Sequence, residues 1–93
     1  MALNFEWDTT KAIQNLRKQR VSFEEAGTVF GDKLSITIHD PLHSDQEDRF
    51  IIIGASIRRR ILVVVHTERK ENIRIISARL ANQRERKIYE ETN

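Results

Sequence analysis

The sequence has no cysteine, one proline and only three glycines among its 93 residues. Without cysteine the chain forms neither a disulfide nor a thiolate metal site, so it folds on its hydrophobic core alone. The glycines stand apart and make no glycine-rich loop that would cradle a phosphate. No apolar run approaches the roughly 18 residues of a membrane span, and the first residues lack the apolar stretch of a signal peptide. Together with the length, these absences predict one cytoplasmic domain over residues 1–93 with no membrane partner.

Net charge is also small, at +2, but the charges are unevenly distributed. Residues 1–50 carry six basic and nine acidic side chains, whereas residues 51–93 carry ten basic and five acidic ones. A local basic excess attracts polyanions, with nucleic acid foremost. The alternative is an ordinary solvated surface, which is what most runs of charge are.

The first half of the chain predicts a short strand followed by two helices. Residues 5–7 alternate as a strand does, and Asp8 can cap a helix that runs to about Arg20. The apolar positions of that helix recur every three or four residues, at Ala12, Ile13 and Leu16. Ser22 and Glu25 form the S-x-x-E pattern of a capping box, which predicts a second short helix.

The second half predicts four strands and a final helix. The strands cover residues 34–39, 50–54, 61–65 and 73–76, and the helix begins near Ala81. The unbroken apolar runs in the second and third strands indicate central strands buried on both faces. Short connections favour antiparallel neighbours. The predicted fold class is α+β, with a mainly antiparallel sheet of four to five strands, two N-terminal helices and one C-terminal helix.

The hairpin between Arg60 and Arg79 carries more arginines than a purely structural hairpin needs. If Lys70 and Glu71 form the turn, the facing pairs are Arg69 with Asn72, Glu68 with Ile73, Thr67 with Arg74, and Val65 with Ile76. One face then carries Thr67, Arg69 and Arg74. The opposite face carries His66, Glu68, Ser77 and Arg79. The pattern leaves open which of the two faces the helices cover.

Both faces offer groups that RNA cleavage requires. Attack of a ribose 2′-hydroxyl on the adjacent phosphate needs a base, an acid, and stabilisation of the charge on the phosphorane. Arginine stabilises that charge by bidentate hydrogen bonds, and glutamate or histidine can transfer the protons. The alternative is that Glu68 forms only a solvated salt bridge with Arg69 or Arg74.

The histidines give weaker signals. His39 and His43 are four residues apart in a segment rich in aspartate, which superficially suits a metal. However, residues 40–48 are predicted to form a loop, and a loop gives such a set no fixed geometry. His66 ends an apolar run, which favours a hydrogen-bonded histidine at the edge of the core over a titrating base. We therefore expect neither a metal nor another cofactor.

Several motifs taken together resemble the BrnT toxins. The motifs are FEWD at 5–8, VSFEEA at 21–26, HTERKENIRIISAR at 66–79 and ERKIYE at 85–90. Single matching residues lie between them: Lys11, Asn15, Lys18, Phe30, His43, Ser44, Arg49 and Gly54. The resemblance covers nearly the whole chain in order. It implies a RelE-like toxin of a bacterial type II toxin-antitoxin module, which cleaves RNA without a metal and inhibits translation and growth.

The resemblance also implies partners and site residues. The protein partner is a BrnA-like antitoxin, which forms a hetero-oligomer with the toxin and binds operator DNA, so that the toxin meets DNA only indirectly. The catalytic residues carried over by motif are Lys11, Glu68, Arg69, Arg74 and Arg79. By their chemistry, the arginines would hold phosphate and transition-state charge, while Glu68 or Lys11 would transfer protons.

One departure from the family pattern bears on activity. Many relatives carry His-Gly after the lysine that corresponds to Lys18, whereas this chain has Gln19 and Arg20. An amide does not exchange protons near neutral pH, so glutamine cannot replace an acid-base histidine. Two alternatives therefore stand beside the ribonuclease. One is a catalytically weakened protein that binds its antitoxin and acts as co-repressor, and the other is a module that binds RNA without cleaving it.

Overall fold

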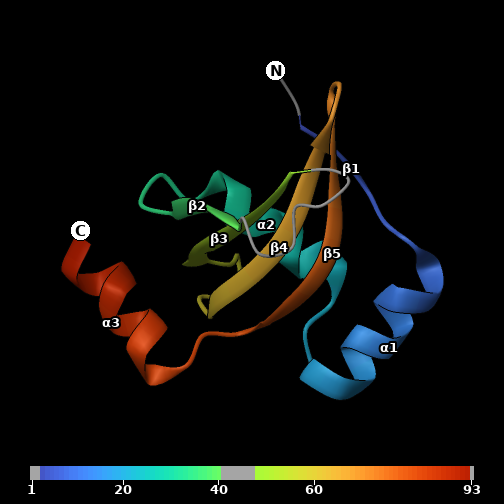
Figure 1. Ribbon diagram of the computed structural model, residues 1–93. Coiled ribbons are helices and arrows are strands. Elements are labelled where there is room, and N and C mark those ends of the chain that lie inside the picture. The colour runs from blue at the N-terminus through green and yellow to red at the C-terminus, as the bar shows by residue number, and fades with distance from the viewer. Residues whose placement is uncertain (1–2, 41–47, 93) are drawn as a thin grey trace.

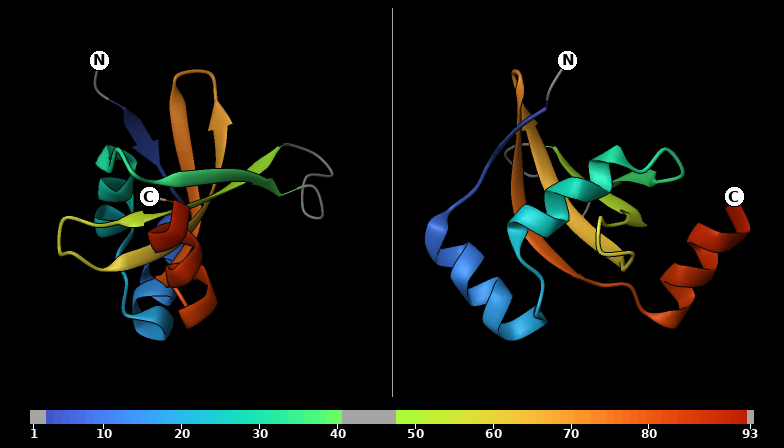
Figure 2. Two further views of the ribbon diagram at one scale, coloured as in Figure 1. Left: turned by 90° about the vertical axis from the view of Figure 1, so that its left-hand side faces the viewer. Right: turned by 180° about the vertical axis from the view of Figure 1, so that it is seen from behind.

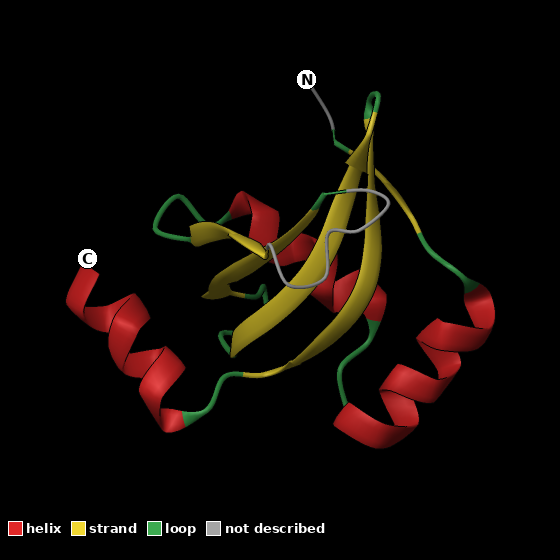
Figure 3. Ribbon diagram, in the orientation of Figure 1, coloured by secondary structure: helices red, strands yellow, loops and turns green. Residues whose placement is uncertain are grey.

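The computed structural model describes residues 3–40 and 48–92, and within them the elements follow the predicted order (Figure 1). The elements are β1 (Asn4–Glu6), α1 (Thr9–Gln19), α2 (Phe23–Thr28), the 3-10 turn η1 (Val29–Gly31), β2 (Ile36–Asp40), β3 (Arg49–Ala55), β4 (Ile61–Arg69), β5 (Asn72–Leu80) and α3 (Gln83–Thr92). Figure 3 shows the helices gathered around one five-stranded sheet. The predicted α+β class is confirmed. No helix in these described ranges is long and apolar enough to cross a membrane.

The sheet has the strand order β1-β5-β4-β3-β2. The last four strands pair antiparallel, as predicted, and β3 and β4 lie inside the sheet. In contrast, β1 pairs parallel with β5, so the sheet is mixed. A parallel pair needs a long connection, and the two strands are separated by most of the chain.

The two predicted helix starts are confirmed by their caps. Asp8 Oδ1 accepts a hydrogen bond of 3.0 Å from the backbone N–H of Lys11 at the start of α1. Ser22 Oγ accepts one of 3.0 Å from the backbone N–H of Glu25 at the start of α2. These bonds satisfy backbone donors that have no partner inside the helix.

Arg20 ends α1 in the left-handed conformation, with φ 60° and ψ 30°. Glycine adopts this conformation without a side-chain clash, whereas other residues are strained there. We expect Arg20→Gly to raise the free energy of unfolding by about 0.5–1 kcal/mol, measured by urea denaturation. The control is Arg17→Gly inside α1, which should lower it by about 1 kcal/mol. A loss of stability in both variants would contradict the strain argument.

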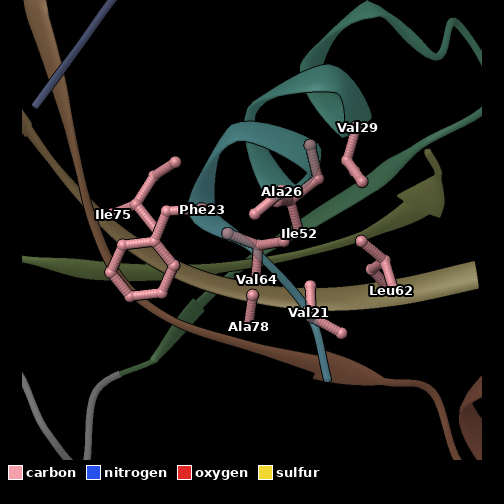
Figure 4. Close-up of a cluster of buried hydrophobic side chains, with 9 residues drawn as sticks. All are labelled: Val21, Phe23, Ala26, Val29, Ile52, Leu62, Val64, Ile75 and Ala78. Carbon is pink, nitrogen blue, oxygen red and sulfur yellow. The ribbon is translucent and has the colours of Figure 1, made fainter. Parts of the chain in front are cut away.

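The core lies on one side of the sheet, beneath α2 and η1. Figure 4 shows its nine buried side chains: Val21, Phe23, Ala26, Val29, Ile52, Leu62, Val64, Ile75 and Ala78. Seen from behind in Figure 2, α2 crosses this side of the sheet, which we call the helix face. Close packing fixes Gly54 in β3, because a Cβ there would lie 2.8 Å from Val29 Cγ1. α3 lies against part of the opposite side of the sheet.

Candidate active site

A β-bulge in β5 brings Arg74 and Arg79 to the same face of the sheet. From the turn to the bulge the predicted register is confirmed: Arg69 faces Asn72, Glu68 faces Ile73 and Thr67 faces Arg74. The register then shifts, because His66 pairs with Ile75 and Val65 pairs with Ser77, which leaves Ile76 as the extra residue. The predicted pair of Val65 with Ile76 is therefore wrong. The prediction that Ser77 and Arg79 lie on the same face as Glu68 is also wrong.

The side of the sheet opposite the helix face carries most of the hairpin's arginines. We call this side the arginine face. Alternation along the strands assigns it the residues between the core positions: Arg49 on β3, Thr67 and Arg69 on β4, and Arg74, Ser77 and Arg79 on β5. This answers the question that the sequence left open. α2 and η1 cover the face of His66, whereas α3 lies over the part of the arginine face near Arg79 and leaves Arg69 and Arg74 accessible.

A row of polar residues crosses the arginine face at the level of Thr67. Direct strand pairing places its five members side by side, in the order Glu6, Arg74, Thr67, Arg49 and Asp40. Neighbouring strands are about 4.8 Å apart, so the backbones at Arg74 and Arg49 are separated by about 10 Å. Two guanidinium groups at that spacing can contact one stretch of nucleic-acid backbone.

Arg74 is held at the surface by a carboxylate from the neighbouring strand. Its Nη1 lies 3.0 Å from Glu6 Oε2, and Asn72 Nδ2 donates to Glu6 Oε1 at 3.1 Å. Both hydrogen bonds lower the pKa of Glu6, and the one from Asn72 has the larger effect. Both partners of the ion pair are about one-third exposed, at 31%. The guanidinium is thus fixed in position and still accessible to a phosphate.

Arg79 has a structural partner on the arginine face. Its Nη1 and Nη2 each lie 2.7 Å from an oxygen of Glu85, in a bidentate pair. Glu85 also accepts from the backbone N–H of Asn82 at 2.9 Å, while Asn82 Oδ1 accepts from the backbone N–H of Glu85 at 2.8 Å. This reciprocal capping box starts α3. The hydrogen bond to Glu85 raises the pKa of Arg79 and lowers that of Glu85. Arg79 therefore fixes α3 to the end of β5.

Glu68 lies apart from the arginines. It pairs with Ile73 on the helix face, and its side chain is exposed near the end of the hairpin. The predicted association of Glu68 with Arg79 is therefore wrong, because the bulge moves Arg79 to the other face. A register derived from a regular hairpin cannot show this.

Lys11 lies on α1, beside the edge of β5. The side chain of Asn15 fixes α1 there, since its Nδ2 donates to the carbonyl of Ala78 at 2.8 Å and its Oδ1 accepts from the N–H of Ala78 at 3.2 Å. The amide thus bonds to β5 as a neighbouring strand would. Lys11, Lys18 and Gln19 line a small hollow of about 190 Å³ together with the bulged residue, Ile76. Gln19, where the sequence departs from the family pattern, therefore lies beside Lys11, a candidate catalytic residue.

His66 is a core residue. It is 2% exposed and packs between two rings, with centroid distances of 4.8 Å to Phe30 and 5.8 Å to Phe50. Its Nδ1 has no hydrogen-bond partner among the described residues. Burial lowers its pKa, against the smaller opposing influence of the Glu68 charge. Burial thus favours the neutral ring in the folded protein, where His66 serves packing.

The buried neutral ring predicts a pH dependence of stability. The folded-state pKa lies below the unfolded value of about 6.5, so the unfolded chain binds the proton first. We expect the free energy of unfolding to fall as the pH drops below about 6.5, by at most about 1.4 kcal/mol per pH unit. Urea denaturation between pH 7.5 and 5 measures this. His66→Phe should reduce the slope, whereas His39→Gln should retain it, and an equal slope in all three proteins would exclude His66 as the cause.

The metal hypothesis finds no support in the part of the chain that the structure describes. No cluster of three or more histidine, aspartate or glutamate side chains there could hold an ion. His39 Nε2 instead lies 3.3 Å from Asp48 Oδ1. His43, the second histidine of that spacing, lies outside the described residues.

The structure adds residues that the sequence argument did not place in the site. Arg49, Asp40 and Glu6 enter it through strand pairing, and Glu85 enters through the cap of α3. Alternation along residues 49–53 could have put Arg49 on one face with Ile51 and Ile53. The pairing of Glu6 with Arg74 had no local signal, because 68 positions separate them.

Comparisons with known proteins find a matching family and similar solved structures. The family model described as "Ribonuclease toxin, BrnT, of type II toxin-antitoxin system" matches residues 7–85, a span that includes Lys11, Glu68, Arg69, Arg74 and Arg79. Among solved structures, the crystal structure of the Brucella abortus ribonuclease toxin BrnT is similar, with a TM-score of 0.64 and 21% sequence identity over 88% of this chain and 100% of that chain. At that identity the likeness concerns the fold. A comparison with curated proteins gave no match.

Proposed function

Since this chain belongs to the BrnT family of ribonuclease toxins of type II toxin-antitoxin systems, we propose that it cleaves RNA on its arginine face. The observation that carries the proposal is the strand pairing that gathers Arg49, Arg69 and Arg74 on one face of the sheet. Arginines bind phosphate by bidentate hydrogen bonds and stay charged at every physiological pH. The covered helix face offers no such surface.

In the proposed reaction, Arg69 and Arg74 bind the scissile phosphate. The ribose 2′-oxygen forms a bond to phosphorus while the bond to the 5′-oxygen breaks. A base takes the 2′-hydroxyl proton, and an acid gives a proton to the departing 5′-oxygen. The guanidinium groups stabilise the charge that develops on the phosphorane oxygens. Arg79 contributes indirectly by fixing α3.

Lys11 and Glu68 are the proposed groups for proton transfer, and their positions favour Lys11. Lys11 lies beside the bulge that follows Arg74, whereas Glu68 lies on the opposite face of the hairpin. We expect Lys11→Met to lower kcat by about 100-fold and Glu68→Gln by less than about 10-fold. Single-turnover cleavage of a labelled RNA measures both. The reverse order of effects would assign proton transfer to Glu68.

Expression of the chain alone tests the function. Rapid growth arrest together with cleavage of cellular RNA is the expected result, and harmless accumulation would contradict it. We propose that the reaction is independent of metal, because arginines and proton-transfer groups account for each step. Cleavage by the purified protein should therefore continue at an unchanged rate in excess EDTA. Loss of cleavage in EDTA would overturn this mechanism.

Gln19 supports a second candidate function, that of a catalytically weakened protein. It lines the same hollow as Lys11, at the position where the resemblance to the BrnT toxins leads us to expect histidine. In this case the wild type would leave growth unaffected, and Gln19→His would restore RNA cleavage. A protein that only binds RNA would show affinity that falls steeply with salt, with no cleavage.

Membership of a type II family implies a protein antitoxin. We propose that this antitoxin is BrnA-like, forms a hetero-oligomer with the chain in the cytoplasm, and contacts operator DNA on behalf of both. Co-purification of the chain with the product of the adjacent short reading frame tests the partner. Binding of operator DNA by the toxin alone would contradict the indirect role.

A further inference from the structure

An apolar groove of about 390 Å³ lies between α3 and the arginine face. Its floor and wall are aliphatic: Ile38, Ile51, Ile53, Val63, Val65 and Ile88. Two of these large side chains are strongly exposed, Ile38 at 51% and Ile88 at 43%. The groove's polar lining residues are Ser77, Asn82, Arg84 and the Arg79–Glu85 pair, so Arg84 is the lining cation that is not part of that pair. In the mechanism proposed above the groove binds no RNA; of its residues only Arg79 has a role there, that of fixing α3.

We propose that the groove receives an amphipathic helix of the antitoxin, with aliphatic side chains on one side and carboxylates on its flank. The inference rests on the proposed function, because it takes the arginine face to be the RNA site. A helix that occupies the groove would bury the exposed isoleucines and pair its carboxylates with arginines. Its function would be to keep RNA away from Arg74.

The lining of the groove favours protein over RNA as the occupant. Unpaired bases stack on aromatic side chains, and the side chains that line this groove include none. The aromatic residues Phe5, Trp7, Phe23 and Phe30 line a different groove, beside α2. Aliphatic side chains of a partner protein are the better fit for the groove under α3.

The strands beneath the groove favour a helix over an extended peptide. β3 and β4 are hydrogen-bonded to a strand on each side, so an occupant that lies over these two strands finds no backbone partners; β2, which carries Ile38, is the edge strand on this side of the sheet. A helix satisfies its own backbone groups and needs only side-chain contacts. The groove is therefore suited to a helix that lies across the sheet.

The position of the groove makes its occupation inhibitory. Val65 in the groove and Thr67 in the polar row are two residues apart on β4, a distance of about 7 Å. A helix with its side chains is about 10 Å wide. One seated over Val65 therefore also covers Thr67 and the neighbouring Arg74, and RNA and the helix exclude each other.

The test measures the affinity of the antitoxin encoded by the adjacent short reading frame, by isothermal titration with the full-length chain. Ile38→Glu and Ile88→Glu put a carboxylate into the groove and should each weaken binding by about 30-fold or more. The control is Ile57→Glu, because Ile57 is 78% exposed and lies outside the groove, and it should change binding less than about 3-fold. Circular dichroism verifies that each variant is folded.

A second pair of variants tests the charge of the occupant. Arg84→Glu should weaken antitoxin binding by about 10-fold and reduce its salt dependence. Arg86→Glu makes the same change of charge on the same helix, but Arg86 lines another surface, with Gln83 and Glu90. It should alter binding less than about 3-fold. Equal effects of the two variants would exclude a specific contact at Arg84.

Three outcomes would overturn the inference. One is unchanged antitoxin affinity in both isoleucine variants. Another is that these variants lose RNA binding while antitoxin affinity stays, which would assign the groove to RNA. A third is that they convert a dimeric toxin into a monomer without affecting the antitoxin, which would assign it to a second copy. RNA cleavage by the wild type, measured separately, tests the proposed function, so failure of either proposal is recognised independently.

Discussion

Arg74→Ala is expected to lower the rate of RNA cleavage by about 100- to 1000-fold while the protein stays folded. The guanidinium lies in the polar row that crosses the arginine face, between Glu6 and Thr67; Glu6 holds it at 3.0 Å, and it is accessible. Removal of one preorganised donor from a developing phosphorane typically costs this much. The change in the free energy of unfolding should stay below about 1 kcal/mol, because the lost ion pair is partly exposed.

Two further variants sharpen the assignment of Arg74. Arg74→Lys keeps the charge but cannot make bidentate contacts, so it should recover only part of the lost rate. Arg86→Ala removes an exposed arginine from α3, away from the polar row, and should change the rate less than about 3-fold. Cleavage by Arg74→Ala at the wild-type rate would remove Arg74 from the site. Equal losses in Arg74→Ala and Arg86→Ala would indicate only a general effect of charge.

The sequence predicted the elements well, because their signals are local. Asp8 and Ser22 mark helix starts by chemistry that acts within three residues, and both caps form as expected. The turn at Lys70 and Glu71 fixed the pairing of its nearest neighbours for the same reason. The antiparallel pairing of the last four strands was also predicted, since their connections are short. The parallel pairing of β1 with β5 was not.

The residues after Ile76 in β5 were assigned to the wrong face of the sheet, because no local sequence pattern marks the bulge. Residues 73–76 read as a regular strand, and nothing in that run marks Ile76 as a bulge. One extra residue moves every later side chain of the strand to the other face, so the predicted group of Glu68 with Arg79 does not exist. The partners of Arg74 and Arg79, Glu6 and Glu85, come from other elements and required the tertiary structure.

The largest effect on stability is expected from Glu25→Ala, at about 3–5 kcal/mol of unfolding free energy. The carboxylate of Glu25 is buried in α2, at 6% exposure. It accepts hydrogen bonds from Ser56 Oγ at 2.7 Å and from Arg60 Nε at 2.9 Å, and it also pairs with Arg60 Nη2. Arg60 in turn donates to the carbonyl of Arg20 at 3.0 Å. One carboxylate thus joins α2, the turn between β3 and β4, and the end of α1.

The loss follows from what Glu25→Ala leaves behind, because the guanidinium of Arg60 would remain partly buried without its partner. Urea denaturation should show a much smaller change, within about 0.5 kcal/mol, for the matched control Glu24→Ala, an exposed neighbour on α2. The double variant Glu25→Leu/Arg60→Met removes both charges and should recover most of the loss, since a buried pair is often replaceable by apolar side chains.

The pair of Glu25 and Arg60 also predicts that the free energy of unfolding falls at acid pH. The hydrogen bond from Arg60 holds the pKa of Glu25 below its ordinary value of 4.5. Its stabilisation is therefore complete above about pH 4.5 and is lost as the pH falls through the folded-state pKa. Glu25→Ala should show a weaker loss of stability with acid than the wild type. A loss below about 1 kcal/mol in Glu25→Ala at pH 7, with an unchanged acid profile, would mean that the buried pair does not hold these elements together.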